Sequence, residues 1–407
     1  MESKNKRILI ISQSHVCRNP RVYKEATTLS GAGYHVTIIT SIYSDELLLE
    51  DKELLSGTGI GYKFAADLRN RSFKNSTIRL MRLFHVKLVR WFKLQTPGAL
   101  GYNLRGYSKL IDNNVSDIYF AHQELSLYFG CRLLKKGKKV VFDFEDWYSE
   151  DLLKEARAER PLKLLKKLEK HALKYGTHVQ TTSNALANAL AQTYESKKPS
   201  VIYNTFDPSP GEVICKDRGS HQALSLYWFS QTLGPGRGIE TIIKAIKAIK
   251  HPLELHLRGN CSPQYHDALF DLMGGQDLHK LYIHSLVSNA ALGDSIKEHD
   301  LGLAFEYYRP LNKDLTASNK IFHYLVNKVP VIASPTMGHK EVAALTKAGV
   351  FLTKDFTSTA ISDVIDLLLT NRQKIDHAKK SLVAASEKIG WSVERGKLLR
   401  TVADILE

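Results

Sequence analysis

Continuous apolar runs and helically spaced apolar positions alternate along this chain. Residues 7–12 (Arg-Ile-Leu-Ile-Ile-Ser) form a short apolar run, which is typical of a parallel strand buried on both faces. Residues 21–29 then show helical spacing, glycines at 31 and 33 end that helix, and 36–40 form a second apolar run. This order predicts a strand, a helix and a parallel strand, the repeating unit of an α/β fold.

The same alternation recurs in two regions separated by a polar stretch. Strands of the first region are predicted at 118–122, 178–183 and 201–204, with another beginning at 140, and those of the second at 224–229, 255–259, 281–285, 300–306 and 331–333. Residues 207–211 (Asp-Pro-Ser-Pro-Gly) are turn formers. We therefore predict two doubly wound Rossmann-like domains, residues 1–206 and 222–390, with a linker at 207–221 and a last helix at 391–407.

Composition supports a two-domain globular protein of the cytoplasm. A chain of 407 residues is too long for one ordinary core, and 43% hydrophobic with 24% charged residues is a globular balance. The four cysteines lie far apart without a CxxC pair, so we expect reduced thiols and neither a disulfide framework nor a zinc site. No signal-peptide core and no apolar run of ~20 residues is present.

The net charge of +15 requires an acidic partner, for which nucleotide phosphates, an anionic membrane face and nucleic acid are the candidates. The residue patterns of common nucleic-acid modules are absent, so we expect no nucleic-acid partner. Residues 78–93 interleave aliphatic and aromatic residues with Arg79, Arg82, Lys87, Arg90 and Lys93. This pattern fits a helix in a membrane interface, and a core helix with a solvated basic face explains it almost as well. A second basic stretch at 154–174 favours peripheral association with the inner face of the cell membrane.

Polar residues follow several predicted strands. His122 ends one strand, and the acidic residues between 143 and 150 follow the next. Ligands of open α/β sheets bind beyond the carboxyl ends of the strands, so we expect both segments to face one crevice. His15 and Arg18, in the loop after the first strand, are expected to be solvated.

Two segments of the second domain are candidate anion sites. Residues 230–238 (Ser-Gln-Thr-Leu-Gly-Pro-Gly-Arg-Gly) form a glycine-rich loop after its first strand, in which backbone N–H groups and Arg237 could contact a phosphate. Ser318 and Asn319 begin a helix, and Lys320 adds a full charge to its positive end. An ordinary capped helix that leads into a core strand explains this second segment equally well.

The segment around Lys320 resembles the donor site of GT-B glycosyltransferases of family 4. The shared residues are Asn319, Lys320, Ile321, Phe322, Tyr324, Pro330, Val331 and Ile332. His323 stands in place of the family's glutamate, Lys328 in place of a glycine, and the Glu-x7-Glu pair is absent, with Leu315 eight positions before His323. In the first domain, Asp143, Asp146 and Glu150 match an Asp-x-His-Asp-x-x-x-Glu pattern in which Glu145 replaces the histidine.

The resemblance spans nearly the whole chain and implies a GT-B fold, two Rossmann-like domains facing across a cleft, with the last helix packing back across both. It also implies glycosyl transfer from a nucleotide-sugar donor on the second domain to an acceptor on the first, with retained configuration and no cofactor. Carboxylates 143 and 145 could also hold magnesium or manganese. Enzymes of this type neutralise the leaving diphosphate without a metal, however, so we expect no metal site.

Roles for individual residues follow from the same resemblance. Arg237 and Lys320, with the helix start at Ser318 and Asn319, would stabilise the leaving diphosphate. His122 would contact the donor sugar, and Asp146 or Glu150 would orient the acceptor. The remaining residues assigned to substrate binding are Ser230, Gln231, Gly236, Gly238, Glu306 and His323.

We expect this transfer to serve bacterial-type surface polysaccharide or glycoconjugate synthesis, with a saccharide or a lipid-linked acceptor. Two alternatives share the architecture. A sugar-nucleotide 2-epimerase would need acid and base carboxylates near the sugar, for which only the 143–150 cluster is available. An inactive GT-B binding protein would explain His323 and the missing Glu-x7-Glu pair.

Overall fold

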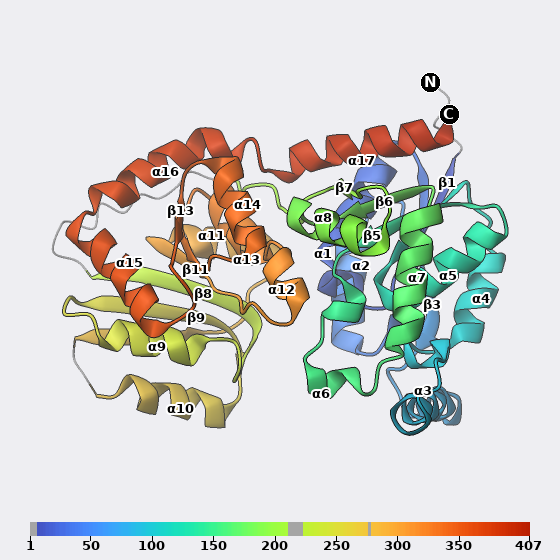
Figure 1. Ribbon diagram of the computed structural model, residues 1–407, viewed down its shortest axis with the longest axis horizontal. Coiled ribbons are helices and arrows are strands. Elements are labelled where there is room, and N and C mark those ends of the chain that lie inside the picture. Colours follow the sequence, from blue (N-terminus) through green and yellow to red (C-terminus); the bar gives the residue numbers. More distant parts are fainter. Residues whose placement is uncertain (1–5, 211–222, 276–277) are drawn as a thin grey trace. The chain divides into compact units, whose positions relative to one another are not determined.

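The computed structural model describes residues 6–210, 223–275 and 278–407. The chain divides into two compact units, Met1–Ile202 with Arg395–Glu407, and Tyr203–Glu394. Each unit is built on one parallel sheet with helices on its faces, as predicted from the alternating pattern (Figure 1). Most of the predicted linker, from residue 211 onward, lies outside the described residues.

The first unit contains a seven-stranded sheet in the order β3-β2-β1-β4-β5-β6-β7. Its strands are β1 (Arg7–Ile11), β2 (His35–Ile42), β3 (Gly61–Asp67), β4 (Ile118–His122), β5 (Lys139–Phe144), β6 (His178–Thr181) and β7 (Ser200–Val201). β1 pairs with β2 and β4. Its residues 8–11 are fully buried because a central parallel strand is covered by helices on both faces.

The helices of the first unit are α1 (Pro20–Gly31), α2 (Asp45–Leu55), α3 (Phe73–Phe92), α4 (Leu104–Asp112), α5 (Gln123–Lys135), α6 (Lys154–Arg157), α7 (Leu162–Tyr175) and α8 (Asn184–Tyr194). Short 3-10 turns are η2 (Val16–Arg18), η3 (Pro97–Ala99) and η4 (Tyr148–Glu150). Asn19 caps α1 by accepting a hydrogen bond from Val22 N, with Pro20 at the first helical position. The last helix, α17 (Trp391–Leu406), begins with residues of the second unit and ends with residues of the first.

The second unit contains a six-stranded sheet in the order β10-β9-β8-β11-β12-β13. Its strands are β8 (Leu224–Leu233), β9 (Leu253–Cys261), β10 (His279–His284), β11 (Leu301–Ala304), β12 (Val331–Ala333) and β13 (Val350–Leu352). Its helices are α9 (Ile239–Lys247), α10 (Pro263–Met273), α11 (Asn289–Lys297), α12 (Leu311–Leu315), α13 (Asn319–Val326), α14 (Met337–Thr346), α15 (Ser358–Thr370) and α16 (Gln373–Ser386).

The first strand of the second unit is longer than predicted. A register shift against β9 occurs after Phe229, and pairing then resumes from Thr232 to Leu233. Leu233 is buried in the core, which draws the chain back into the sheet. Ser230 and Gln231 therefore belong to β8, and the glycine-rich turn is confined to residues 234–238.

Both sheets reverse their strand order next to the first strand of the unit, between β1 and β4 and between β8 and β11. At such a point the connections leave in opposite directions, and the carboxyl ends of the two strands border a crevice that commonly holds the ligand. Functional residues are therefore expected at these edges of the two sheets. No helix among the described residues is long and apolar enough to cross a membrane.

Candidate functional site

A cavity of about 250 Å³ opens in the first unit beyond the carboxyl ends of β1, β4 and β5. The segment after β1 contributes Gln13, the start of α5 contributes Gln123, and the loop after β5 contributes Glu145. Its full lining is Gln13, Arg82, Leu100, Gln123, Glu124, Glu145, Asp146, Tyr148 and Arg160. Most of these side chains hydrogen-bond through oxygen or nitrogen, as binding of a sugar's hydroxyl groups requires.

Hydrogen bonds of Gln13 and Gln123 fix the part of the cavity lining that these two residues form, which is called the glutamine wall here. Gln123 Oε1 accepts a hydrogen bond from Gln13 N at 2.8 Å, and Gln13 Nε2 donates to Leu100 O at 2.9 Å. Gln123 has a φ of +70°. A left-handed conformation costs a residue with a side chain on the order of 1–3 kcal/mol, and the surrounding hydrogen bonds, including Gln123 N to Tyr148 Oη at 3.0 Å, maintain it. The glutamine wall is preorganised.

Hydrogen bonds from the protein interior hold Glu145 in place. Its carboxylate accepts hydrogen bonds from His122 Nδ1 at 2.9 Å and from Asn19 Nδ2 at 3.0 and 3.1 Å. The side chain is 17% exposed, so part of the carboxylate still faces the cavity. The residue that replaces the family's histidine therefore links the cavity to a buried charge network.

His122 lies inside that network and is fully buried. Its Nε2 is 3.1 Å from Glu25 Oε2, and its Nδ1 contacts Glu145. Burial alone would lower the pKa of His122, but the carboxylates of Glu25 and Glu145 outweigh it and raise the pKa to about 10. The ring is an imidazolium at neutral pH that donates from Nδ1 to Glu145 and has the Glu25 carboxylate beside Nε2. A contact with the donor sugar stays a prediction.

Arg21 supplies the second positive charge of the network. Its Nε donates to Asp143 Oδ2 at 2.6 Å, and Gln180 Nε2 donates to the same oxygen at 2.6 Å. Burial would raise the pKa of Asp143, but Arg21 and His122 lower it overall. Burial and the charge of Asp143 raise the pKa of Glu25 to about 7. Oxygen and nitrogen atoms of Glu25, His122 and Asp143 lie close enough to hold a metal ion, but Arg21 and the imidazolium already neutralise these carboxylates.

The structure separates the two acidic residues assigned to the acceptor. Asp146 lines the cavity, whereas Glu150, in η4, is absent from the lining. Glu150 pairs with Arg157 at 2.6 Å and Lys166 at 3.0 Å. Burial opposes ionisation of Glu150, but these cations lower its pKa overall. Glu150 thus serves in a surface ion-pair cluster in this structure.

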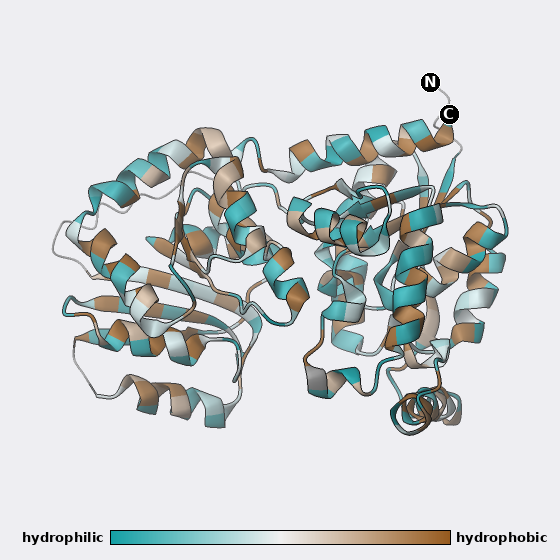
Figure 2. Ribbon diagram, viewed as in Figure 1, coloured by the Kyte–Doolittle hydropathy of each residue, from teal (hydrophilic) through white to brown (hydrophobic). Residues whose placement is uncertain are grey.

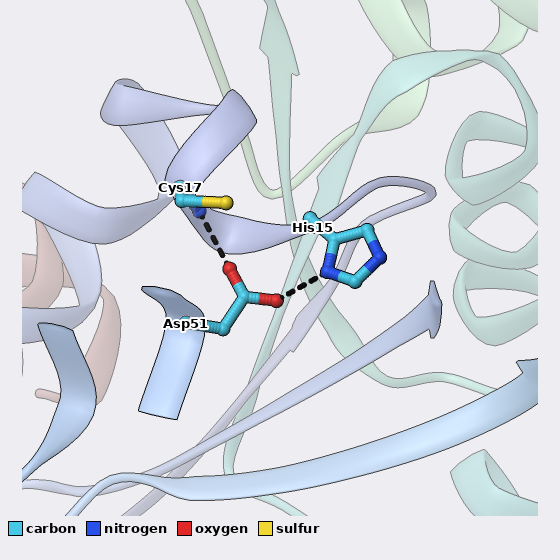
Figure 3. A group of neighbouring side chains, drawn as sticks. All are labelled: His15, Cys17 and Asp51. Atoms are coloured by element: carbon cyan, nitrogen blue, oxygen red, sulfur yellow. Dashed lines mark hydrogen bonds and ion pairs between the residues drawn. The ribbon is translucent and has the colours of Figure 1, made fainter. Parts of the chain in front are cut away.

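The histidine in the loop after β1 is buried, contrary to the expectation of a solvated residue. His15 Nδ1 donates to Asp51 Oδ2 at 2.5 Å, and Cys17 N donates to Asp51 Oδ1 at 2.8 Å (Figure 3). His15 Nε2 accepts from Tyr43 N at 2.9 Å, and Tyr62 Oη donates to Asp51. Cys17 Sγ lies 3.6 Å from Leu47 O. Because all the atoms that could ligate a metal have contacts within the protein, we interpret the group as a structural link between the first loop and α2. Asp51 is 36 positions from His15, so spacing could not reveal the pair.

In the second unit, Lys320 lies at the start of α13. Its Nζ is 3.2 Å from Glu306 Oε1 and 5.3 Å from the centre of the Trp228 ring. Ser318 occupies the N-cap position, but its side chain makes no cap hydrogen bond and instead contacts the buried His339 Nε2 at 3.1 Å. The first backbone N–H groups of α13 therefore lack a side-chain cap, and Asn319 at the first helical position is exposed.

The glycine-rich turn leads directly into α9. Gly236 and Gly238 have φ values of +77° and +82°, which glycine adopts without steric cost. A β-carbon on Gly238 would also lie 2.3 Å from the Phe356 ring. Arg237 is exposed between them and donates from Nη1 to Ser230 Oγ at 3.0 Å. Cationic side chains thus lie at the starts of two helices, α9 and α13.

His323 packs against aromatic rings. Its imidazole stacks on Phe206 with ring centres 3.5 Å apart and meets the Phe229 ring edge-on at 5.5 Å. This packing gives the histidine a structural role that a glutamate could not fill. A contact with the donor stays a prediction for this residue, as it does for Gln231, which is exposed on β8.

Helix α3 leaves an unusual number of large apolar side chains exposed. Phe73 is 91% and Trp91 63% exposed. Figure 2 shows this helix nearly end-on, with both hydrophobic and hydrophilic residues in its coil. The other exposed apolar residues of α3 are Leu80, Met81, Leu83, Phe84 and Phe92. The basic residues do not share one solvated face, however. Arg79 donates to backbone carbonyls of residues 68 and 70, and Arg82 lines the cavity.

Comparisons with known proteins agree with this architecture. Residues 21–210 match the model of Glycosyltransferase Family 4. Among solved structures, Anabaena HepE in complex with UDP-glucose superposes with a TM-score of 0.65 at 16% identity, over 98% of this chain and 100% of HepE. Sucrose-phosphate synthase from Thermosynechococcus elongatus gives 0.69 at 14% identity, over 98% and 99% of the two chains.

A candidate UDP-N-acetylglucosamine 2-epimerase from Listeria monocytogenes gives a TM-score of 0.60 at 12% identity, over 99% of this chain and 97% of the other. No curated protein sequence matches the chain significantly. Likeness at these identities reports the fold, while the family match rests on the residues that build the first unit and most of its cavity. The chain has the GT-B fold, and its residues 21–210 match the model of Glycosyltransferase Family 4.

Proposed function

We propose that this protein is a glycosyltransferase that moves a sugar from a nucleotide-sugar donor to an acceptor bound by the first unit. The observation that carries the proposal is the match of residues 21–210 to a glycosyltransferase family, since this segment contains most of the polar cavity. The complexes of HepE with UDP and UDP-glucose support a nucleotide-sugar donor. The family match also favours transfer over epimerisation.

The chemistry assigned to the second unit is electrostatic. Negative charge grows on the diphosphate as the glycosidic bond breaks, and Arg237, Lys320 and the uncapped start of α13 are suited to stabilise it. Glu306 beside Lys320 keeps the ammonium group in place before the donor binds. These groups supply positive charge without a cofactor, and we propose that the reaction is metal-independent and retains the anomeric configuration.

The proposed acceptor is a saccharide or a lipid-linked saccharide of surface polysaccharide or glycoconjugate synthesis. The exposed apolar side chains of α3 support peripheral docking on an anionic bilayer, because aromatic residues enter the headgroup region and nearby cations attract it. Lys87, Arg90 and Lys93 are the exposed cations of this helix end. Each cation near an anionic surface contributes about 1 kcal/mol.

Docking is tested by sedimentation with anionic and neutral vesicles at low and high salt. We expect binding to anionic vesicles at low salt, and a strong loss in a Trp91→Ser variant that also carries Lys87→Gln and Lys93→Gln. A matched pair of changes away from α3, Lys244→Gln and Lys247→Gln on α9, should leave sedimentation unchanged. Equal sedimentation of the α3 variant would contradict docking through this helix.

The transfer itself is tested by nucleoside diphosphate release. The protein is incubated with a panel of nucleotide sugars, with and without a membrane lipid extract and oligosaccharides as acceptors. Acceptor-dependent release of the diphosphate with mass gain of the acceptor is the expected result. Isomerised donor without release would identify an epimerase, and donor binding without turnover would identify an inactive binding protein.

A further inference from the structure

The cavity of the first unit contains a guanidinium whose charge is not paired by the other lining residues. Arg82 reaches the cavity from α3, and its Nε is buried without a hydrogen-bond acceptor among the residues that the structure describes. The guanidinium lies 4.3 Å from the centre of the Tyr102 ring. Stacking on this ring holds the planar group in place and leaves its edge available for a ligand.

The other charges of the lining have partners of their own. Arg160 forms an ion pair with Glu124. Glu145 is paired with the buried imidazolium of His122 at 2.9 Å, and Asp146 has further contacts of its own. Arg82 is therefore the lining cation that is suited to a negatively charged ligand.

A buried N–H without an acceptor costs free energy, about 1–3 kcal/mol for a neutral group and more for a charged one. Nε itself is enclosed, but the part of the guanidinium that lines the cavity offers the anionic oxygen of a ligand a charge-assisted hydrogen bond. The arginine fork matches the oxygens of a phosphate, with two parallel N–H donors. The neighbouring amide and hydroxyl groups of Gln13, Gln123 and Tyr148 suit hydroxyl groups instead.

We propose that the cavity binds a phosphorylated saccharide as the acceptor, with the phosphate on Arg82. This inference rests on the proposed glycosyl transfer and names its acceptor class. Arg82 acts as the residue that selects the phosphate, and it lies on the same helix as the exposed apolar side chains of α3. Lipid carriers are joined to sugars through phosphate, so this helix is placed to meet both the lipid and its phosphate.

The test measures anion binding by isothermal titration with inorganic pyrophosphate. Saturating UDP is present, so that any phosphate site of the second unit is already occupied. Arg82→Gln should bind pyrophosphate at least ten-fold more weakly than the wild type, and Arg82→Lys, which keeps the charge and loses the fork, should be intermediate. Lys109→Gln, at an exposed cation on α4 of the same unit, is the matched control and should bind as the wild type does.

Equal affinity of wild type and Arg82→Gln, or no pyrophosphate binding by the wild type, would overturn the proposal. Arg82→Lys keeps the test valid if the glutamine variant fails to fold. A second experiment uses dodecyl phosphate in phosphatidylcholine vesicles. Vesicle binding that depends on Arg82 assigns the phosphate to a lipid carrier. If only pyrophosphate binding depends on Arg82, the phosphate belongs to a soluble sugar phosphate. If neither UDP nor any other nucleoside diphosphate binds, the proposed function fails instead.

Discussion

Raising the pH should destabilise the first unit through His122. The folded pKa of about 10 lies above the ordinary value of 6.5, so the stabilisation is fully present below pH ~6.5 and is lost as the pH rises towards 10. Between pH 6.5 and 8.5 the unfolded imidazole loses its proton and the folded one keeps it. At about 1.4 kcal/mol for each tenfold change in proton affinity, this removes about 2 kcal/mol of unfolding free energy.

Glu25 also makes the free energy of unfolding fall as the pH rises. Its folded pKa of about 7 lies above the ordinary 4.5, so the folded state holds an extra proton between these values and loses it as the pH rises further. The buried thiols of Cys17 and Cys131, whose pKa values are raised by burial, affect stability only where an unfolded thiol ionises, near pH 9. Glu124, whose pKa burial raises to about 7, adds to the loss, and His171 and His178, whose pKa values burial lowers, oppose it. The share of the network is therefore the difference in pH dependence between the wild type and His122→Gln.

The assay is urea unfolding at pH 6.5, 7.5 and 8.5, followed by pulsed hydrogen exchange and mass spectrometry of peptides from β4 and β5, which report on the first unit alone. His122→Gln should reduce the pH dependence to less than half, whereas His35→Gln, a change at an exposed histidine on β2, should retain it. A wild-type free energy that does not change with pH, or an unchanged slope in His122→Gln, would refute the assignment of a buried imidazolium.

Four further substitutions test the second unit and the cavity. Arg237→Ala and Lys320→Ala should each weaken binding of a nucleoside diphosphate by ~1.5–3 kcal/mol, the scale of a lost hydrogen bond to a charged group. Calorimetric titration measures this affinity. Wild-type affinity in both variants would exclude the assigned site. Gly238→Ala should lower the thermal midpoint by several degrees, because the β-carbon would meet Phe356 at 2.3 Å, and an unchanged midpoint would contradict that packing. Glu145→Gln should leave diphosphate affinity unchanged and lower the acceptor-dependent rate at least ten-fold, as steady-state kinetics would show.

Continuous apolar runs predicted the order of the strands well, because a parallel strand buried on both faces must be apolar throughout. The run at 7–12 became β1, His122 ends β4, and Glu145 directly follows the adjacent strand β5. The predicted end of β8 was wrong, because the register shift of this strand depends on its pairing with β9, and no local sequence pattern indicates that pairing.

The candidate site was less predictable, because contacts between distant residues decide it. In the sequence, Arg82 is one of five cations on an amphipathic helix. The structure places its guanidinium over the Tyr102 ring and in the lining of the cavity. The burial of His122 depends on Arg21 and Glu25 from α1, about 100 positions earlier. Glu145 was noticed only as a departure from a family pattern, and its bonds to His122 and Asn19 reveal why a carboxylate suits that position.

Ser318 hydrogen-bonds to His339 instead of capping α13, and this lowers the local stability of the helix start. A serine that caps a helix typically contributes ~1 kcal/mol, and α13 lacks this contribution because the Ser318 side chain bonds to His339 instead. An anion that binds the free N–H groups would supply the missing cap, so the first turn of α13 should be a locally labile element that a bound nucleoside diphosphate makes rigid. Hydrogen exchange at residues 320–322 should then slow on ligand binding by more than at the start of α14, where Thr336 already caps its own helix.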